Sequence, residues 1–346
     1  MDTSVWVFLL FEIIIAVACC LGNVLVIWLV WTSGALRKPP FCFIVSLAVA
    51  DFLVGSTGIP LTILVELGIK ISDHGCLCMC CVVLMLQVAS VAILLAIAFD
   101  RFLRVCIPLR YKATVSKKLS WMVVAFCWLT AALLSFIPMF GWHNQTRDST
   151  SKKCSLYNVF SYSYVVNLLF FSFFLPLLFV MTGLYCYIFL TTRKQLRANI
   201  GVAAQSRRNC QKEHRLAASL VLVLVLCAVC LLPLLLMFTL YHYHPNIQIP
   251  HVVYDIGVLL SQANSAFNPI VYAFNVPRIK GSCRKTLRRA FPSKCQQSEQ
   301  HSNADRNMNI TAESSSITYK RTIENNSATQ SQETTTQMSL SSQCRS

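Results

Sequence analysis

The chain has 346 residues, of which 55% are hydrophobic and 13% are charged. This composition is too apolar for a soluble protein to cover its surface, so it excludes a soluble globular domain and indicates that most of the chain lies in lipid. The formal charge of +16 would suit a protein that binds nucleic acid. The basic residues lie in alternate loops rather than on one soluble face, however, which argues against nucleic acid as a partner.

Seven apolar runs follow one another along the chain, and each is long enough to cross a bilayer, which takes about 20 apolar residues. They are residues 5–31, 41–66, 76–104, 119–142, 162–190, 215–243 and 249–275. The first run begins almost at Met1 and carries Glu12 with no basic region before it, so we interpret it as a retained helix rather than a signal peptide. The sequence therefore predicts an all-α membrane protein with a seven-transmembrane helix bundle over residues 1–275.

Basic residues concentrate in the loops after the first, third, fifth and seventh runs. They include Arg37, Lys38, Arg110, Lys117, Lys118, Arg193, Lys194 and Arg284. The other loops hold few basic residues and offset them with acidic ones. Because cytoplasmic loops carry the excess of lysine and arginine, this pattern predicts an extracellular N-terminus and a cytoplasmic C-terminus. Seven crossings in this orientation are typical of a receptor in the plasma membrane.

The chain has 17 cysteines, and most of them lie within the apolar runs, where they serve as small packing residues. Cys76 and Cys154 are expected on the extracellular side, where an oxidising environment permits a disulfide, so we predict that these two form one. Cys78, Cys80 and Cys81 are alternative partners. Their number also suits a metal site, although no histidine pattern completes one.

One glycosylation sequon, which begins at Asn144, lies in the long extracellular loop. The sequons that begin at Asn309 and Asn325 fall in the predicted cytoplasmic part of the chain, which the glycosylation machinery does not reach. We therefore predict glycosylation at Asn144 alone.

Two segments with different compositions follow the last run. Residues 276–291 carry apolar residues every fourth position and basic residues on the other faces, which indicates an amphipathic helix on the membrane surface; a soluble helix is the alternative. Residues 292–346 are rich in Ser, Thr, Gln and Asn, which predicts a disordered cytoplasmic tail. Its hydroxyl groups suit phosphorylation by receptor kinases and subsequent binding of arrestin. Cys295 is a candidate for palmitoylation or a free thiol.

Asp51 lies in the middle of the second run, where an ionisable residue costs roughly 2.5–3.5 kcal/mol on insertion scales. Ser90 in the third run, and Asn264 and Asn268 in the seventh, lie at depths that let them converge on it. Such an all-oxygen cluster suits a small hard cation, so we predict an allosteric sodium site at Asp51 and no other cofactor. A water-filled polar network is the alternative.

Asp100 and Arg101 lie at the cytoplasmic end of the third run, and Glu213 lies where the sixth begins. Arg101 can pair with both acids in a resting state and release them when the sixth helix moves, which would make a two-state switch. An arginine that only reaches toward the membrane interface is the alternative. Pro233 and Pro269 lie inside apolar runs, where a proline frees a carbonyl group and favours a hinge.

These motifs together resemble the rhodopsin-like G-protein-coupled receptors, over residues 5–291. The residues that carry the resemblance occur one set per helix, in the order and spacing of that class: Asn23, Asp51, Asp100–Phe102, Trp128, Pro233 and Asn268–Tyr272. The resemblance implies a switch formed by Asp100, Arg101, Glu213 and Tyr272, which opens the inner face of the bundle to a heterotrimeric G protein.

Within that class, three stretches are similar to adenosine receptors. They are Leu95–Arg101 continuing through Leu103–Val105 and Ile107–Lys112, then Pro138–Trp142, and Leu260–Ser265. The second and third loops, including Arg193–Leu196, look most like the subtypes that couple to inhibitory G proteins and lower cyclic AMP. The resemblance implies an extracellular nucleoside-like ligand, with adenosine as the first candidate.

The same resemblance implies a ligand pocket between the outer ends of the helices. Its expected residues are Glu12, Val83, Leu84, Gln87, Leu156, Phe238, Ser261 and Gln262. Glu12 and Ser261 match the nucleoside-binding residues of the family. Leu156, Phe238 and Gln262 stand where the family has a phenylalanine, an asparagine and a histidine. Gln87 and Leu231 replace a threonine and a tryptophan.

The replacements leave a second interpretation open, in which the same receptor fold takes a more apolar ligand or signals without one. A buried hydrogen-bonding group that loses its partner costs on the order of 1–3 kcal/mol, so these changes matter for a polar heterocycle. A transporter would show internal repeats and several deep charges, which this sequence lacks. No nucleophile and base pair, phosphate loop or metal-ligand spacing indicates an enzyme. The expected partners are therefore a small molecule, a G protein and membrane lipid.

Overall fold

The computed structural model describes residues 3–37, 39–67, 71–108, 110–111, 115–143, 154, 159–198, 204–247 and 250–275. Several predictions lie outside these residues: the amphipathic helix 276–291, the tail 292–346, and the roles of Asn144, Leu156 and Cys295. The side chains of Glu213 and Tyr272 also lie outside the described part, although the backbone of both is helical.

The described chain folds into helices alone, and no strand forms within it. The helices are α1 (Thr3–Thr32), η1 (Ala35–Arg37), α2 (Pro39–Leu53), η2 (Val54–Gly58), α3 (Ile59–Glu66), α4 (Asp73–Cys106), α6 (Lys117–Phe136), η3 (Ile137–Phe140), η4 (Tyr164–Phe174), α8 (Leu175–Ala198), α9 (Ala204–Tyr243) and α10 (His251–Asn275). The segments α2, η2 and α3 are continuous, as are α6 with η3 and η4 with α8, so the elements make seven columns. The predicted all-α class and seven-helix bundle are confirmed.

Six of the seven columns are long and apolar enough to cross a membrane. The seventh column, α10, was also predicted to cross the membrane. Its mean hydropathy is too low for it to be counted with the other six. Its polar residues explain the difference, because Ser261, Gln262, Asn264, Ser265 and Asn268 are all buried inside the bundle rather than exposed to lipid. A helix whose polar face is covered by protein needs fewer apolar residues than an isolated span.

The ends of the helices show why these elements begin and bend where they do. Ser72 and Ser116 cap α4 and α6, since their hydroxyl groups accept hydrogen bonds from the backbone of Gly75 (3.2 Å) and Leu119 (3.1 Å). The π-helical segments η2 and η4 each lie just before a proline, Pro60 and Pro176. A proline removes one backbone donor, and a locally wider turn accommodates that loss.

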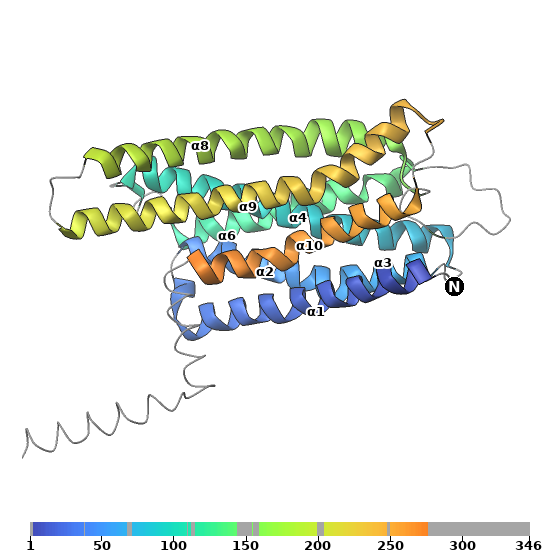
Figure 1. Ribbon diagram of the computed structural model, residues 1–346, viewed down its shortest axis with the longest axis horizontal. Helices are drawn as coiled ribbons and strands as arrows, with labels where there is room; N and C mark the ends of the chain where they lie inside the picture. Colours follow the sequence, from blue (N-terminus) through green and yellow to red (C-terminus); the bar gives the residue numbers. More distant parts are fainter. Residues whose placement is uncertain are drawn as a thin grey trace, which may run out of the picture. The chain divides into compact units, whose positions relative to one another are not determined.

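The columns close into a bundle with α4 in contact with several others. Figure 1 shows the helices running alongside one another, and the contacts follow the order α1 with α2, α2 with α4 and α6, α4 with α6 and α8, α8 with α9, α9 with α10, and α10 with α1. A hydrogen bond from the Trp128 indole to the Ser46 hydroxyl (3.0 Å) joins α6 to α2. Large apolar side chains such as Phe126 and Phe179 face outward, as expected of a surface that lies in lipid.

The two largest of the four apolar clusters lie in different parts of the bundle. One surrounds Cys76 and Cys154 and includes Phe160, Phe238 and Tyr254. We call this part of the bundle the disulfide end. The other extends along the rest of the bundle toward Arg101 and packs against Phe102. We call the part around the C-terminus of α4 the Arg101 end.

Candidate functional site

A cavity of about 110 Å³ lies inside the disulfide end of the bundle. Six of the predicted pocket residues line it: Val83, Leu84, Gln87, Phe238, Ser261 and Gln262. They come from α4, α9 and α10, which the fold brings together although the residues lie far apart in the sequence. The structure therefore gathers most of the predicted pocket around one space.

Eight lining residues were not anticipated. They are Thr62, Phe160, Val165, Leu169, Leu234, Leu235, Tyr254 and Val258. Helical spacing could have found some of them, because Tyr254 and Val258 precede Gln262 by eight and four positions and share its face of α10. Phe160 lies before η4 and carries no such local signal.

A second cavity, of about 120 Å³, adjoins the first and shares Leu84, Gln87 and Ser261 with it. Leu231, which stands in place of the family tryptophan, lines this deeper space together with Phe173 and Phe174. The two cavities together form one largely apolar volume. We call it the bundle cavity.

Glu12, the remaining predicted pocket residue that the structure describes, lies directly behind the lining rather than in it. Its side chain is 0% exposed, and its Oε1 accepts a hydrogen bond from Gln262 Nε2 at 3.0 Å. This contact joins α1 to α10. Gln87 Nε2 likewise donates to the Ser261 carbonyl oxygen at 3.3 Å, which joins α4 to α10. Three helices are thus linked by side-chain amides at the wall of the cavity.

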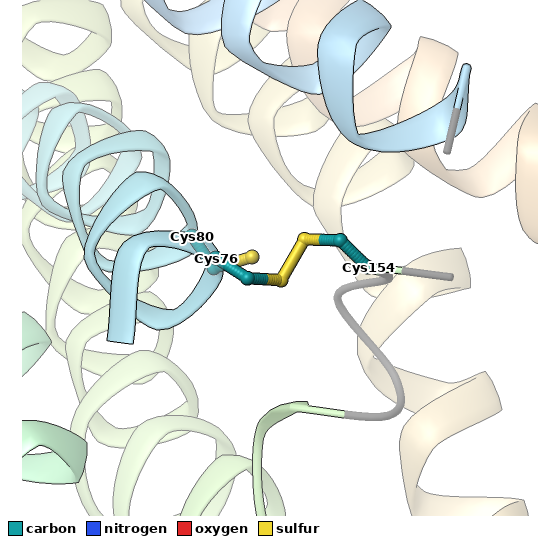
Figure 2. Close-up of side chains that lie close together, drawn as sticks. All are labelled: Cys76, Cys80 and Cys154. Carbon is teal, nitrogen blue, oxygen red and sulfur yellow. A yellow bond between two sulfur atoms is a disulfide. The ribbon is translucent and has the colours of Figure 1, made fainter. Parts of the chain in front are cut away.

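The predicted disulfide between Cys76 and Cys154 is present, with a Cα–Cα distance of 5.9 Å. It ties Cys154 to the first part of α4. Figure 2 shows the free thiol of Cys80 on α4 beside this bond, and the three sulfur atoms lie within 4.8 Å of one another. Because two of them are joined in a disulfide, they do not act as thiolate metal ligands. Cys78 and Cys81 are free thiols.

The polar cluster around Asp51 lies between the cavity and the Arg101 end. Asp51 is 0% exposed, and its two oxygens accept hydrogen bonds from the Ser90 hydroxyl at 3.0 Å and from Asn268 Nδ2 at 2.8 Å. Asn264 is also buried, but its amide nitrogen has no hydrogen-bond partner within the described residues. The structure thus brings three of the four predicted residues into contact and leaves the fourth nearby on α10.

Asn23 on α1 is a further buried polar residue that contacts α10. Its Nδ2 donates to the carbonyl oxygens of Cys19 at 2.9 Å and Ser265 at 3.3 Å. Gly22 packs beside it, since a Cβ atom at that position would lie 3.0 Å from the ring of Pro269. The close approach of α1 and α10 therefore holds the proline-containing part of α10 at a fixed distance from the cluster.

The Asp100 carboxylate accepts a hydrogen bond from the Tyr111 hydroxyl at 2.6 Å. Tyr111 lies eleven residues beyond Asp100, past the end of α4. Burial is the larger cause, and this hydrogen bond the second, of the rise in the pKa of Tyr111 above its ordinary value. The hydroxyl therefore stays protonated and remains a donor. The pairing of Arg101 with Asp100 and Glu213 in a resting state stays a prediction.

Comparison with known proteins agrees with this architecture. The sequence model of the family described as 7 transmembrane receptor (rhodopsin family) matches residues 22–272. The chain is 38% identical to "Adenosine receptor A3" of Canis lupus familiaris over 274 residues, which is 78% of this chain and 87% of that protein. The proteins of the same name from Bos taurus and Ovis aries are also 38% identical over 273 residues, which is 78% of this chain and 86% of each relative.

Both the family and these relatives are signalling receptors rather than enzymes, which accords with the expectation from the sequence. The matched residues contain all seven helical columns, except the first part of α1 and the last part of α10. On the strength of the family match, the membrane-spanning helices and the shared bundle, this chain belongs to the rhodopsin family of seven-transmembrane receptors.

Proposed function

We propose that this chain is a plasma-membrane receptor that binds an extracellular small molecule in the bundle cavity and activates a heterotrimeric G protein at its Arg101 end. The observation that carries the proposal is the gathering of six independently expected pocket residues around one interior space. Ligand sites in helical bundles are typically such concave, mostly apolar spaces with a few polar groups. The family relationship is the reason for proposing a G protein as the partner that receives the signal.

The same proposal includes the orientation of the bundle in the membrane. Exposed basic side chains occupy the Arg101 end: Arg104, Arg110, Lys117, Lys118, Arg193, Lys194 and Arg197. The positive-inside rule assigns this end to the cytoplasm, where a G protein binds. The disulfide end then faces the oxidising exterior, which is the environment in which a disulfide persists. Arrestin and receptor kinases would act on the tail after residue 291.

The family relationship makes a nucleoside-like ligand the first candidate, because the relatives are named adenosine receptors. Coupling to inhibitory G proteins, with a fall in cyclic AMP, is the corresponding output. A second candidate is a more apolar ligand. It is favoured by Phe238, which lines the cavity and packs against the ring of Tyr162 at a centroid distance of 6.3 Å. An aromatic residue there offers no polar group to a purine edge.

We also propose that sodium binds at Asp51 and stabilises the resting receptor. Asp51 supplies a carboxylate, and Ser90, Asn264 and Asn268 can supply neutral oxygens of the kind that hard cations prefer. In the described structure, Ser90 and Asn268 donate hydrogen to the carboxylate. Binding of sodium would therefore require the Asn268 amide to turn its oxygen toward the ion.

Adenosine titration tests the ligand and the coupling together. We would measure cyclic AMP in forskolin-treated cells that lack their own adenosine receptors and that express this chain or its Arg101→Ala variant at equal surface level. A saturable fall that Arg101→Ala abolishes is the expected result for an inhibitory adenosine receptor. No response from surface-expressed receptor would reject adenosine as the ligand. A rise in cyclic AMP would reject inhibitory coupling.

A further inference from the structure

A cavity of about 350 Å³ lies between α4, α6 and α8, outside the bundle cavity. Most of its lining residues lie between positions 92 and 103 of α4 and between positions 119 and 130 of α6. Phe173 and Leu177 complete the lining from η4 and α8, and Phe173 is the one lining residue that it shares with the bundle cavity. The space is therefore distinct from the proposed ligand site. We call it the α4–α6 groove.

The groove lies at the outer surface of the bundle. Three of its lining side chains, Phe99, Leu119 and Phe126, are 44%, 38% and 68% exposed. The helices on both sides of it are long and apolar enough to span a membrane, so the exposed surface between them lies in lipid. Ala92 and Ala96 lie about one turn apart on the α4 wall, where their small side chains leave room between the larger ones. A molecule of the bilayer therefore has access to this space.

The depth of the groove corresponds to one leaflet of the bilayer. Its lining runs from 92 to 103 on α4 and from 119 to 130 on α6, which is about 16 Å along each helix. Half of a hydrocarbon core of about 30 Å is about 15 Å. Leu103 lies three residues before the end of α4, and Leu119 lies two residues after the start of α6, so the groove begins at the Arg101 end. This depth matches an acyl chain of a lipid in the leaflet at that end.

Basic side chains lie at the end of the groove where the headgroup of such a lipid would be. Arg104 follows the last lining residue of α4, and Lys117 and Lys118 precede the first lining residue of α6; all three are exposed. Asp100 also lines the groove, but it is only 5% exposed and accepts the hydrogen bond of the Tyr111 hydroxyl. The exposed charge next to the groove is thus basic. Because each basic residue at a membrane surface adds to the attraction for anionic lipid, this end favours an anionic headgroup.

We infer that the α4–α6 groove binds an acyl chain of an anionic phospholipid, whose headgroup meets Arg104, Lys117 and Lys118. The inference goes beyond the proposed function, from which it takes only the assignment of the Arg101 end to the cytoplasm, where the leaflet carries anionic lipid. A sterol has no charged headgroup and would use the apolar space without the basic residues. The bound chain would pack against both Leu103 and Val115, which lie on either side of the connection from α4 to α6.

Photochemical labelling tests the site directly. One copy of the purified full chain is placed in each nanodisc of phosphatidylcholine, with a small fraction of phosphatidylserine that carries a diazirine in the middle of one acyl chain. Peptide mass spectrometry then locates the labelled residues. We expect label to concentrate on residues 92–103 and 119–130, at a yield about tenfold above that of a phosphatidylcholine probe with the same chain. Equal yields from the two probes, label spread evenly over all helices, or displacement by cholesterol rather than by unlabelled phosphatidylserine would overturn the inference.

A variant that fills the groove assigns the label to this space. Val123→Phe places a larger side chain in the lining, so it should lower the yield from the phosphatidylserine probe at least about fivefold. Val180→Phe is the matched control, because Val180 is 44% exposed on α8 and does not line the groove, and it should leave the yield unchanged. Equal labelling of the two variants would contradict the site.

A second pair of variants tests the headgroup. Lys117→Gln combined with Lys118→Gln should reduce labelling by phosphatidylserine toward the level of phosphatidylcholine. Arg193→Gln combined with Lys194→Gln removes as much exposed basic charge from α8, away from the groove, and should keep the preference. These surface changes leave the packing of the bundle intact, so they decide the question even if Val123→Phe disturbs the fold. Retention of the full preference by the Lys117 and Lys118 variant would overturn the inference. Since neither a receptor ligand nor a G protein is present, either result leaves the proposed function to its own test.

Discussion

Asp51 is held by one donor from α4 and one from α10, so a single carboxylate links three helices. Both of its oxygens are engaged, and the side chain is fully buried. Such a group cannot be exchanged for an apolar residue without leaving the hydroxyl of Ser90 and the amide of Asn268 without an acceptor. An ion bound at Asp51 would therefore act on three helices at once.

If sodium binds at Asp51, the purified receptor should melt at a higher temperature in sodium chloride than in potassium chloride of equal concentration. At about ten times the dissociation constant the ion would add ~1.4 kcal/mol, or about 2–4 °C in melting temperature for a bundle of this size. Asp51→Asn should abolish the difference, while Asp73→Asn, a change at the exposed start of α4, should keep it. Equal melting of the unmodified receptor in both salts would reject the site.

Single residues could be predicted from the sequence where their type is unusual for their position. An acid in the middle of an apolar run and a cysteine at the outer end of one are such cases, and the structure places Asp51 in a polar cluster and Cys76 in a disulfide. The contact of Asp100 with Tyr111 was not predictable in this way, because a tyrosine near a helix end is common. The directions of the amide hydrogen bonds in the cavity depend on rotamers and also have no signal in the sequence.

At the scale of the elements, close packing between α1 and the second column depends on glycine. A Cβ atom on Gly55 of η2 would lie 2.7 Å from the Cβ atom of Cys19 and 2.9 Å from the backbone oxygen of Ala16. Both positions belong to α1, and backbone atoms do not move aside as a flexible side chain would. The π-helical turn thus brings the second column into direct contact with the backbone of α1.

We therefore expect Gly55→Ala to destabilise the receptor by about 1–3 kcal/mol, the usual effect of adding a methyl group to a packed interior. Thermal unfolding of the purified protein would measure this. Gly183→Ala in α8 is the control, because a Cβ atom there meets nothing within 4 Å and alanine favours a helix. Its stability should be unchanged or higher. A Gly55→Ala protein that unfolds at the temperature of the unmodified receptor would contradict the packing described here.

The number and place of the helices were predictable because a bilayer sets the length of an apolar run, and each of the seven predicted runs corresponds to one column. The full lengths were not, since α9 begins at Ala204 rather than at residue 215. The segments η2 and η4 were not predicted. A shift of hydrogen bonds from the fourth to the fifth residue changes neither composition nor hydropathy, so the prolines that follow were the sole local hint. The low hydropathy of α10 was also not predicted to matter. Its polar face is buried against other helices, and that burial is a property of the assembled bundle.

At the scale of the whole molecule, the bundle places a cavity at one end and a buried acid with its neighbouring arginine at the other. The Asp51 cluster lies between them, and Pro233 and Pro269 interrupt the two helices, α9 and α10, that contact each other along the interior. Occupation of the cavity can affect the Arg101 end only if it favours one of two arrangements of these helices. The proposed receptor function therefore requires a ligand that favours one of the two arrangements of α9 and α10 over the other.

Guanine-nucleotide exchange tests this account most directly. Membranes containing the chain would be mixed with purified heterotrimeric G proteins of each class, with and without adenosine, and the rate of GTP-analogue binding would be compared with that of Arg101→Ala at equal receptor density. We expect faster exchange on at least one G protein, and a rate at least about fivefold lower with Arg101→Ala. Exchange equal to that of membranes without receptor for every class, with the two receptors indistinguishable, would contradict it.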